Sequence, residues 1–383
     1  MTDQFLFLLM LSFVAATLVQ LFYWGVFYFL LRHEPRQPNR PVDTGDSGEK
    51  MPESETPGIS VVICARNEEK KVAQNLPLIL NQNYRSFEIL IIDDHSEDGT
   101  AEVVAQFQKF YPYLRIVKNI NIKKSAGKKD ALTLGVNSAK FDIIAVTDAD
   151  CIPESPNWLQ SMSEKLTADK DIVLGYGPYI PQRGMLNSFI RFETTMTALQ
   201  YFSYANAGVP YMGVGRNMLY RKSSFEKNQG FSTHSEIASG DDDLFVREVA
   251  TAKNTAISLD PETFLYSESK PDLRSYVRQK IRHLSTGKHY KWYHKLLLGC
   301  FGASHSWHYV ALILLMLFKY YFLLTICLYF LRIFVVTLTC AQVFKKLREQ
   351  SILKSIVWLD AAMGIYFILS AFLPYITKNR TWK

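Results

Sequence analysis

The sequence predicts an α/β domain with a doubly wound, mostly parallel sheet, flanked by transmembrane helices. Between residues 59 and 147, short runs rich in β-branched residues alternate with helical patterns, as in parallel sheets that are covered on both faces. The chain has 383 residues, 48% of them apolar, and a mean hydropathy of -0.02. The apolar excess lies mainly at the two ends of the chain, and residues 4–31 contain no charged side chain.

Residues 1–31 are expected to form a membrane helix. At about 1.5 Å per residue, this stretch can cross a hydrocarbon core about 30 Å thick. A cleaved signal peptide is the alternative, but no basic segment precedes the stretch and its apolar part is too long. Arg32, Arg36 and Arg40 follow it directly. The positive-inside rule therefore predicts an integral protein of the inner (plasma) membrane whose main domain is cytoplasmic.

Residues 32–57 are expected to be a linker, because they combine prolines and charges with almost nothing apolar. The globular domain is expected at residues 58–295. Its expected strands are 60–65, 87–92, 114–118, 143–147 and 172–175, and its expected helices are 68–80, 100–110, 128–139 and 156–167. A long segment at 185–206 either lies in the membrane interface or packs in the core.

Residues 296–383 are expected to return to the membrane as two or three helices. Residues 303–341 are almost wholly apolar, but they are long for one span and short for two, and we favour two. A further span is expected at 353–376, with Asp360 near its beginning. The net charge of +7 is interpreted as basic residues that face anionic lipid, and no nucleic-acid partner is expected because no RNA- or DNA-binding motif is present.

Three acidic clusters carry the candidate chemistry. They are Asp93 with Asp94, Asp148 with Asp150, and Asp241 with Asp242. The first two clusters follow apolar runs, so they should lie at the carboxyl ends of strands, where α/β sheets bind ligands. Carboxylate oxygens suit a hard divalent cation. The sequence thus predicts a Mg²⁺ or Mn²⁺ site at Asp148 and Asp150 that holds a diphosphate, with an ordinary surface turn as the alternative.

Six motifs in order, over about residues 59–290, resemble those of family 2 glycosyltransferases with a GT-A fold. They are Ser60–Glu69, Ile91–Thr100, Gly127–Leu132, Asp148–Asp150, Gly213–Arg221 and Ser239–Leu244. The resemblance implies an inverting, membrane-anchored enzyme that uses a nucleotide-sugar donor, with UDP as the expected nucleotide. The acceptor that it implies is a lipid-linked molecule or a saccharide at the cytoplasmic face.

The resemblance also assigns roles to individual residues. The donor contacts that it implies are Ala65, Arg66, Asn67, Glu68, Asp93, Asp94, Lys128, Asp148, Gln279 and Arg282. Asp150 is the usual direct metal ligand. Asp241 aligns with the catalytic base that deprotonates the acceptor, but the family usually has Glu-Asp where this chain has Gly240-Asp241. Asp242 therefore remains an alternative candidate for the catalytic base.

Several of these residues have structural alternatives. Asp93, Asp94 and Glu68 suit helix caps as well as nucleoside contacts. Lys128 and Lys129 begin a helix, where phosphate is favoured, but they also suit a solvated surface. Residues 279–283 resemble the Gln-x-x-Arg-Trp motif of processive polysaccharide synthases, with His283 in place of Trp. A basic helix that faces the membrane would carry the same residues.

Transfer of one or a few sugars is the expected activity, because three or four spans are too few for an obvious polymer channel within one chain. One alternative is a processive β-glycan synthase whose channel comes from a homo-oligomer or from another membrane subunit. The other is a non-catalytic, membrane-tethered nucleotide-binding protein. The presence of all three acidic clusters argues against that last alternative, because simple binding does not require Asp241.

Overall fold

The chain folds into two compact units. The computed structural model describes residues 3–28, 31, 57–120, 128–237 and 239–376. The unit that we call the sheet unit comprises residues 33–180 and 205–268, and the helical unit comprises residues 1–32, 181–204 and 269–380. Nearly all of the expected linker, together with Arg32, Arg36 and Arg40, lies outside the described residues, and so does Gly127.

The sheet unit contains a mostly parallel sheet, as predicted. Its strand order is β3-β2-β1-β4-β7-β6-β8. The strands are β1 (Ile59–Ala65), β2 (Phe87–Asp93), β3 (Leu114–Lys118), β4 (Ile143–Asp148), β6 (Ile172–Leu174), β7 (Met218–Arg221) and β8 (Thr255–Ile257). Strands β3, β2, β1 and β4 pair in parallel, and so do β6 and β8, whereas β7 runs antiparallel to both β4 and β6.

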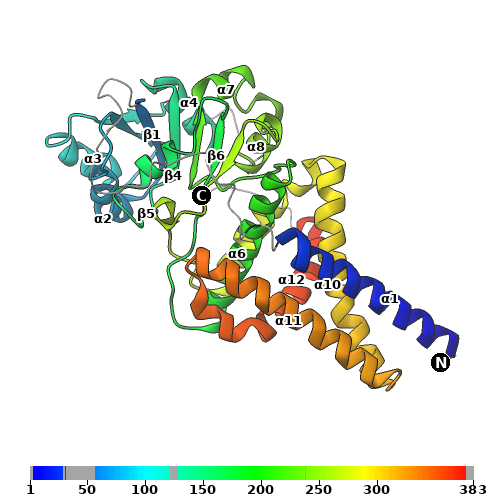
Figure 1. Ribbon diagram of the computed structural model, residues 1–383. Helices are drawn as coiled ribbons and strands as arrows, with labels where there is room; N and C mark the ends of the chain where they lie inside the picture. The colour runs from blue at the N-terminus through cyan, green and yellow to red at the C-terminus, as the bar shows by residue number, and fades with distance from the viewer. Residues whose placement is uncertain (1–2, 29–30, 32–56, 121–127, 238, 377–383) are drawn as a thin grey trace, which may run out of the picture. The chain divides into compact units, whose positions relative to one another are not determined.

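Helices cover both faces of this sheet (Figure 1). On one face, alternate residues of β1 pack in a core formed with α2 (Glu69–Leu80), α3 (Thr100–Gln108) and α5 (Trp158–Ser163). On the other face lies α4 (Lys129–Ser138). Its Gly135 lies so close to the sheet that an added Cβ would be 2.4 Å from Val62 Cγ1. A glycine is required there because the helix backbone itself contacts the strand.

Parallel register aligns the carboxyl ends of the central strands. Ala65 of β1 pairs with Asp93 of β2, and Cys64 pairs with Asp148 of β4. A two-stranded sheet of β5 (Ile152–Pro153) and β9 (Leu265–Tyr266) then holds the segment after β4. The unit is completed by α7 (Lys222–Lys227) and α8 (Asp243–Val249). The first two acidic clusters therefore lie at one edge of the sheet.

Among its described residues, the helical unit contains four helices that are long and apolar enough to cross a membrane. They are α1 (Asp3–Phe22) with its π-helical continuation Tyr23–Tyr28, α10 (Trp292–Leu317), α11 (Phe322–Lys346) and α12 (Ile356–Ile376). The expectation of two helices within the apolar stretch 303–341 agrees with α10 and α11. These helices indicate membrane association.

Two further helices belong to the helical unit rather than to the sheet unit. They are α6 (Met185–Asn206), most of which lies in it, and α9 (Leu273–Leu284), and both fall before the expected domain boundary at residue 295. Most side chains of α6 are buried, so α6 packs in a core. Its charges are paired there: Arg191 Nη2 lies 2.5 Å from Glu349 Oε2, and Glu193 pairs with Lys280.

A polar cluster joins all four long helices. Arg332 of α11 pairs with Asp360 of α12, with 2.5 Å between Nη1 and Oδ2. Its Nη2 also donates to Gln20 Oε1 of α1 at 2.9 Å and lies 3.2 Å from His305 Nδ1 of α10. These side chains are buried. The cluster explains how charged residues are accommodated in otherwise apolar segments.

Candidate functional site

A lysine joins two of the acidic clusters in the sheet unit. Lys128 Nζ lies 2.9 Å from Asp148 Oδ1 at the end of β4 and 3.1 Å from Asp241 Oδ2 just before α8. The side chains of Lys128 and Asp241 are 14% and 13% exposed, whereas that of Asp148 is 39% exposed. Two carboxylates from distant parts of the sequence therefore share one ammonium group at a partly open edge of the sheet.

The charge of Lys128 is stabilised by these carboxylates. Burial alone would lower the pKa of Lys128, but Asp148 and Asp241 outweigh it and raise that pKa well above its usual range. Lys128 is therefore protonated at neutral pH. A cation at this position favours negatively charged ligands, as expected for a phosphate contact, but in this structure its direct contacts are carboxylates.

The donor atoms near Asp148 fit a divalent cation. One ligand atom each of Asp148, Asp150 and Cys151 lie within 4.8 Å of one another. The two carboxylates suit Mg²⁺ or Mn²⁺, which take few protein ligands and keep waters and phosphate oxygens. Cys151 is fully buried and belongs to the apolar core, and burial raises its pKa above the usual range. The oxygen pair is therefore the better match for a hard cation.

Asp241 and Asp242 have different surroundings. Asp242 caps α8: its Oδ1 accepts a hydrogen bond from Asp243 N at 2.8 Å, and its Oδ2 accepts one from Gly215 N at 2.9 Å. Burial and the charges of Asp241 and Asp243 raise the pKa of Asp242 to about 7. Such a pKa suits a general base, but both Asp242 oxygens are engaged by backbone amides. Asp241, whose Oδ2 faces Lys128, is the better placed of the two.

The Asp93 and Asp94 pair divides into a ligand candidate and a structural residue. Asp94 is fully buried, and its Oδ1 accepts from Asn119 Nδ2 at 2.9 Å, so it fixes the end of β2 against the residue after β3. Asp93 Oδ1 accepts from Ser96 N at 3.0 Å, which is the turn cap considered as the alternative. Within the described part of the chain, Asp93 Oδ2 accepts no hydrogen bond, so that oxygen can face a nucleoside.

The loop after β1 is tied to the loop after β2. Asn67 has φ 55°, donates through its backbone N–H to Ser96 Oγ at 3.1 Å, and accepts from Glu97 N at 2.8 Å. Glu68 occupies the N-cap position of α2, but its side chain makes no capping hydrogen bond. Arg66 is partly exposed and Ala65 is buried in the strand. These bonds hold the expected nucleoside loop in one conformation next to Asp93.

Lys129 differs from the sequence expectation of a phosphate contact or a surface lysine. It is only 1% exposed, and its Nζ donates to the carbonyl oxygens of His234, Ile237 and Ser239 at 2.6, 2.8 and 3.0 Å. All three N–H groups of the ammonium are therefore directed at the segment that precedes Asp241. The sequence does not distinguish Lys129 from the neighbouring Lys128, because it does not show which segment of the chain covers the start of α4.

The central residues of the motif Gly213–Arg221 make structural contacts within the sheet unit. Asn217 is fully buried and donates to Tyr176 O and Thr263 O, both at 2.7 Å, while accepting from Trp158 Nε1 at 3.1 Å. The guanidinium carbon of Arg216 lies 4.4 Å from the centre of the Tyr179 ring. Asn217 thus joins the start of α5, the segment after β6 and the 3-10 helix Pro261–Thr263, a role that the sequence pattern alone does not reveal.

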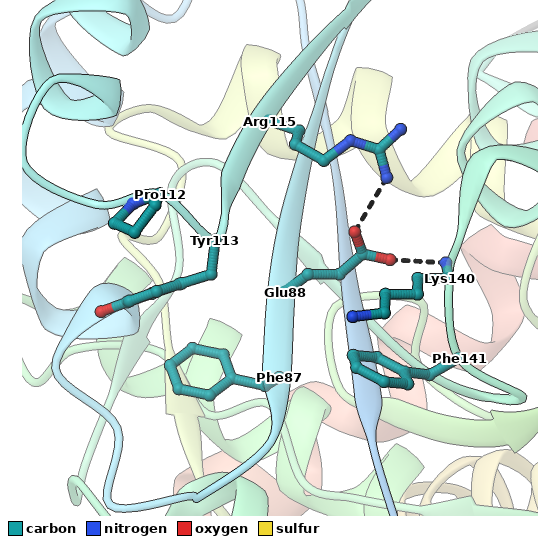
Figure 2. Close-up of a pocket in the computed structure, with 7 residues that line it drawn as sticks. All are labelled: Phe87, Glu88, Pro112, Tyr113, Arg115, Lys140 and Phe141. Carbon is teal, nitrogen blue, oxygen red and sulfur yellow. Dashed lines mark hydrogen bonds and ion pairs between the residues drawn. The ribbon is translucent and has the colours of Figure 1, made fainter.

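A surface cavity of about 390 Å³ lies away from these residues. It is found where β2 and β3 begin, at the opposite edge of the sheet, and Figure 2 shows Phe87, Tyr113 and Phe141 lining it. Glu88 crosses it and pairs with Arg115 at 2.9 Å. The first two acidic clusters end their strands at the carboxyl edge, and Lys128 joins Asp148 there to Asp241, so we base the candidate site on these residues and not on this cavity.

Comparison with known proteins identifies the domain. Residues 60–228 match the family described as glycosyl transferase family 2, and this segment includes β1, β2, β4 and the Asp148–Asp150 pair. Residues 60–228 therefore form a glycosyl transferase family 2 domain. The match ends before Asp241, so the assignment of that residue comes from its position in the sheet unit and from the sequence motif.

Relatives of this family 2 domain support the same assignment. The chain is 29% identical over 133 residues to the poly-β-1,6-N-acetyl-D-glucosamine synthase of Staphylococcus epidermidis, covering 34% of this chain and 30% of the relative. It is 35% identical over 102 residues to the probable glycosyltransferase YdaM of Bacillus subtilis, covering 26% and 24%. The matches thus span less than a third of these relatives' length.

A solved structure shares the fold. It is a mannosyltransferase of Pyrobaculum calidifontis in complex with GDP-Man and Mn²⁺, with a TM-score of 0.60, 18% identity, and coverage of 98% of this chain and 99% of that one. At this identity the comparison shows a GT-A-like fold.

The remaining predicted site residues lie in the helical unit. Gln279 and Arg282 are on α9, whose N-terminus is capped by Asp272 Oδ1 through a 2.9 Å hydrogen bond from Ser275 N. Arg282 Nη2 lies 3.4 Å from His283 Nε2, and His283 is exposed. A diphosphate contact by Arg282 stays a prediction, as does the domain's cytoplasmic location.

Proposed function

We propose that this protein transfers a sugar from a UDP-sugar to a hydroxyl group of a lipid-linked or saccharide acceptor at the cytoplasmic face of the plasma membrane, with inversion of the anomeric centre. The observation that carries the proposal is the bridge from Asp148 through Lys128 to Asp241. It brings the expected metal-binding carboxylate and the expected base into one site. The family 2 domain supports the reaction class, and the four long apolar helices support the location.

Donor binding would rest on the carboxyl edge of the sheet. Asp148 and Asp150 would hold Mg²⁺ or Mn²⁺, and Asp93 Oδ2 would accept a hydrogen bond from the nucleoside. When bound, the metal would neutralise negative charge that grows on the leaving diphosphate. The solved mannosyltransferase with GDP-Man and Mn²⁺ supports metal use within this fold. Lys128 would turn from the carboxylates toward the phosphates.

Asp241 would act on the acceptor. The acceptor oxygen forms a bond to the anomeric carbon while the bond from that carbon to the diphosphate oxygen breaks, and the diphosphate leaves with the electron pair. The acceptor proton passes to the Asp241 carboxylate. Such assistance accelerates a reaction by about 10²- to 10⁴-fold. Asp242 would hold α8 and Gly215 in place, because its oxygens are already bonded to backbone amides.

A processive synthase is the second candidate, supported by the similarity to a poly-β-1,6-N-acetyl-D-glucosamine synthase. The two candidates share donor chemistry and differ in product length. We favour short transfer because the four candidate spans within the described residues would need further subunits to enclose a polar polymer. Radiolabelled donor supplied to the purified protein distinguishes them: one or a few added sugars are expected, and long product would establish the synthase.

The proposal is tested by metal-dependent transfer from a panel of nucleotide sugars. Full-length protein in membrane vesicles should transfer sugar from at least one UDP-sugar with Mg²⁺ or Mn²⁺ and should lose transfer in excess chelator. Asp150→Ala should weaken donor binding at least tenfold. Asp169→Ala is the matched control, because that carboxylate is 70% exposed in a turn. Undiminished transfer in chelator, or no transfer from any nucleotide sugar, would contradict the proposal.

A further inference from the structure

A buried lysine supports the segment that carries Asp241. Lys129 begins α4, and its ammonium donates to the carbonyl oxygens of residues 234, 237 and 239. Residue 239 is separated from Asp241 only by Gly240, which has φ +97°. Few residues other than glycine adopt that backbone conformation. The Lys129 side chain thus holds the backbone that leads to Asp241, and this backbone turns sharply at Gly240.

The same segment has a second anchor on α8. Glu248 accepts from Thr233 Oγ1 at 2.6 Å and from Asn228 Nδ2 at 3.0 Å, and it lies 3.4 Å from His234 Nδ1. Burial raises the pKa of Glu248, but bonds from His234, Asn228 and Thr233 outweigh it and hold that pKa at about 2. Glu248 therefore fixes the start of the segment as an anion, and Lys129 fixes its end.

The burial of the Lys129 ammonium carries an energetic cost that its hydrogen bonds to carbonyl oxygens must offset. Removing an ammonium from water is unfavourable, and burial lowers the pKa of Lys129 to about 8, although Asp241, Asp243, Asp242 and Glu248 oppose this. Three carbonyl acceptors compensate for the lost water. A methionine of similar length would fill the space, but it would leave those carbonyls without their donor.

We propose that Lys129 is a positioning residue for Asp241: by holding the three carbonyls it sets where the base meets the acceptor hydroxyl, without touching the donor or the acceptor itself. The inference rests on the proposed function. It separates the adjacent lysines into two roles. Lys128 faces the ligand side and contacts Asp148 and Asp241, whereas Lys129 acts on the backbone behind Asp241. Small displacements of a catalytic group have large kinetic effects, about 10²-fold for 1 Å.

The test compares Lys129→Met with a matched control, Lys222→Met. Lys222 Nζ also donates to backbone carbonyls, those of Asn137 and Ala139 at 3.4 and 3.2 Å, but these lie at the end of α4 away from Asp241. We expect Lys129→Met to lower kcat about 10- to 100-fold when kcat is calculated for the fraction of protein molecules that bind the donor. Its donor KM and its affinity for UDP with Mn²⁺ should stay within about twofold of wild type. Lys222→Met should leave kcat, donor KM and UDP affinity unchanged.

A general loss of structure would give a different pattern, because it removes donor binding and turnover together. Lys129→Arg retains the charge and should recover part of kcat. If Lys129→Met does not fold, Glu248→Gln provides the second variant, because it releases the other anchor of the same segment. That variant should also lower kcat more than it changes donor affinity. Equal loss of kcat and donor affinity in the folded variants would overturn the inference.

A double-mutant cycle with Asp241→Asn separates failure of this inference from failure of the proposed function. If Lys129 acts through Asp241, adding Lys129→Met to Asp241→Asn costs no further activity. A full additional loss in the double variant would overturn the positioning role. If Asp241→Asn itself transfers at the wild-type rate, the proposed base is wrong. If Asp241→Asn is impaired while Lys129→Met has wild-type kcat, only the present inference fails.

Discussion

Replacement of Lys128 by methionine should tighten Mn²⁺ binding to the protein without donor, even though it should weaken donor binding. Lys128 Nζ lies 2.9 Å from Asp148 Oδ1, so a metal that takes Asp148 must first displace the ammonium. Because Asp148 is 39% exposed, the water-like limit of the Coulomb energy applies, which is about 1.4 kcal/mol at this distance. Removing the pair should therefore lower the Mn²⁺ dissociation constant by up to about tenfold.

The assay is a titration of full-length protein with Mn²⁺, with free ion followed by electron paramagnetic resonance. Lys128→Arg keeps the charge and should bind Mn²⁺ as the wild type does. Lys222→Met removes a lysine outside the site and serves as the control for net charge. The UDP affinity of Lys128→Met, measured with saturating Mn²⁺, should fall. Unchanged or weaker Mn²⁺ binding in Lys128→Met would refute the reasoning that this ammonium and the metal compete for Asp148.

Three further outcomes test the structure that supports the site. Gly135→Ala should destabilise the sheet unit by about 1–3 kcal/mol, because its methyl group would overlap Val62, and an unchanged melting temperature would contradict the contact. Glu248→Gln should lower stability by about 1–3 kcal/mol at pH 7. In the folded protein the pKa of Glu248 is lowered from 4.5 to about 2, so the stability difference between Glu248→Gln and wild type should shrink as the pH falls from 4.5 to about 2. A stability difference that stays constant over this pH range would exclude a contribution of the Glu248 charge. Asp360→Ala should destabilise the detergent-solubilised protein by about 3–5 kcal/mol by leaving Arg332 buried without its carboxylate, and an unaltered thermal transition would argue against this.

The sheet edge could be predicted from the sequence because its signals are local. Apolar, β-branched runs mark the strands, and carboxylates directly after residues 92 and 147 mark where two of them end. Parallel pairing then brings those ends together without further information. The same reasoning does not reach β7, a four-residue strand whose antiparallel place between β4 and β6 depends on nonlocal pairing.

Nonlocal contacts also explain what the sequence left undecided. The sequence left α6 as compatible with a membrane interface as with a core, because Glu349 and Lys280, the partners of Arg191 and Glu193, are distant in sequence. Lys128 and Lys129 look equivalent beside one another in the sequence, but Lys128 is the N-cap residue of α4 and Lys129 is its first helical residue, so their backbone conformations differ. One therefore meets the carboxylates, and the other meets the backbone before Asp241.

The proposed function depends most on one role, that of Asp241 as the group that accepts the acceptor proton in a site whose donor Asp148 and Asp150 would hold. Single-turnover transfer by Asp241→Asn, with donor affinity measured on the same sample, tests it most directly. We expect a rate lower by about 10²- to 10⁴-fold with donor affinity within about twofold of wild type. A rate equal to that of the wild type would contradict it.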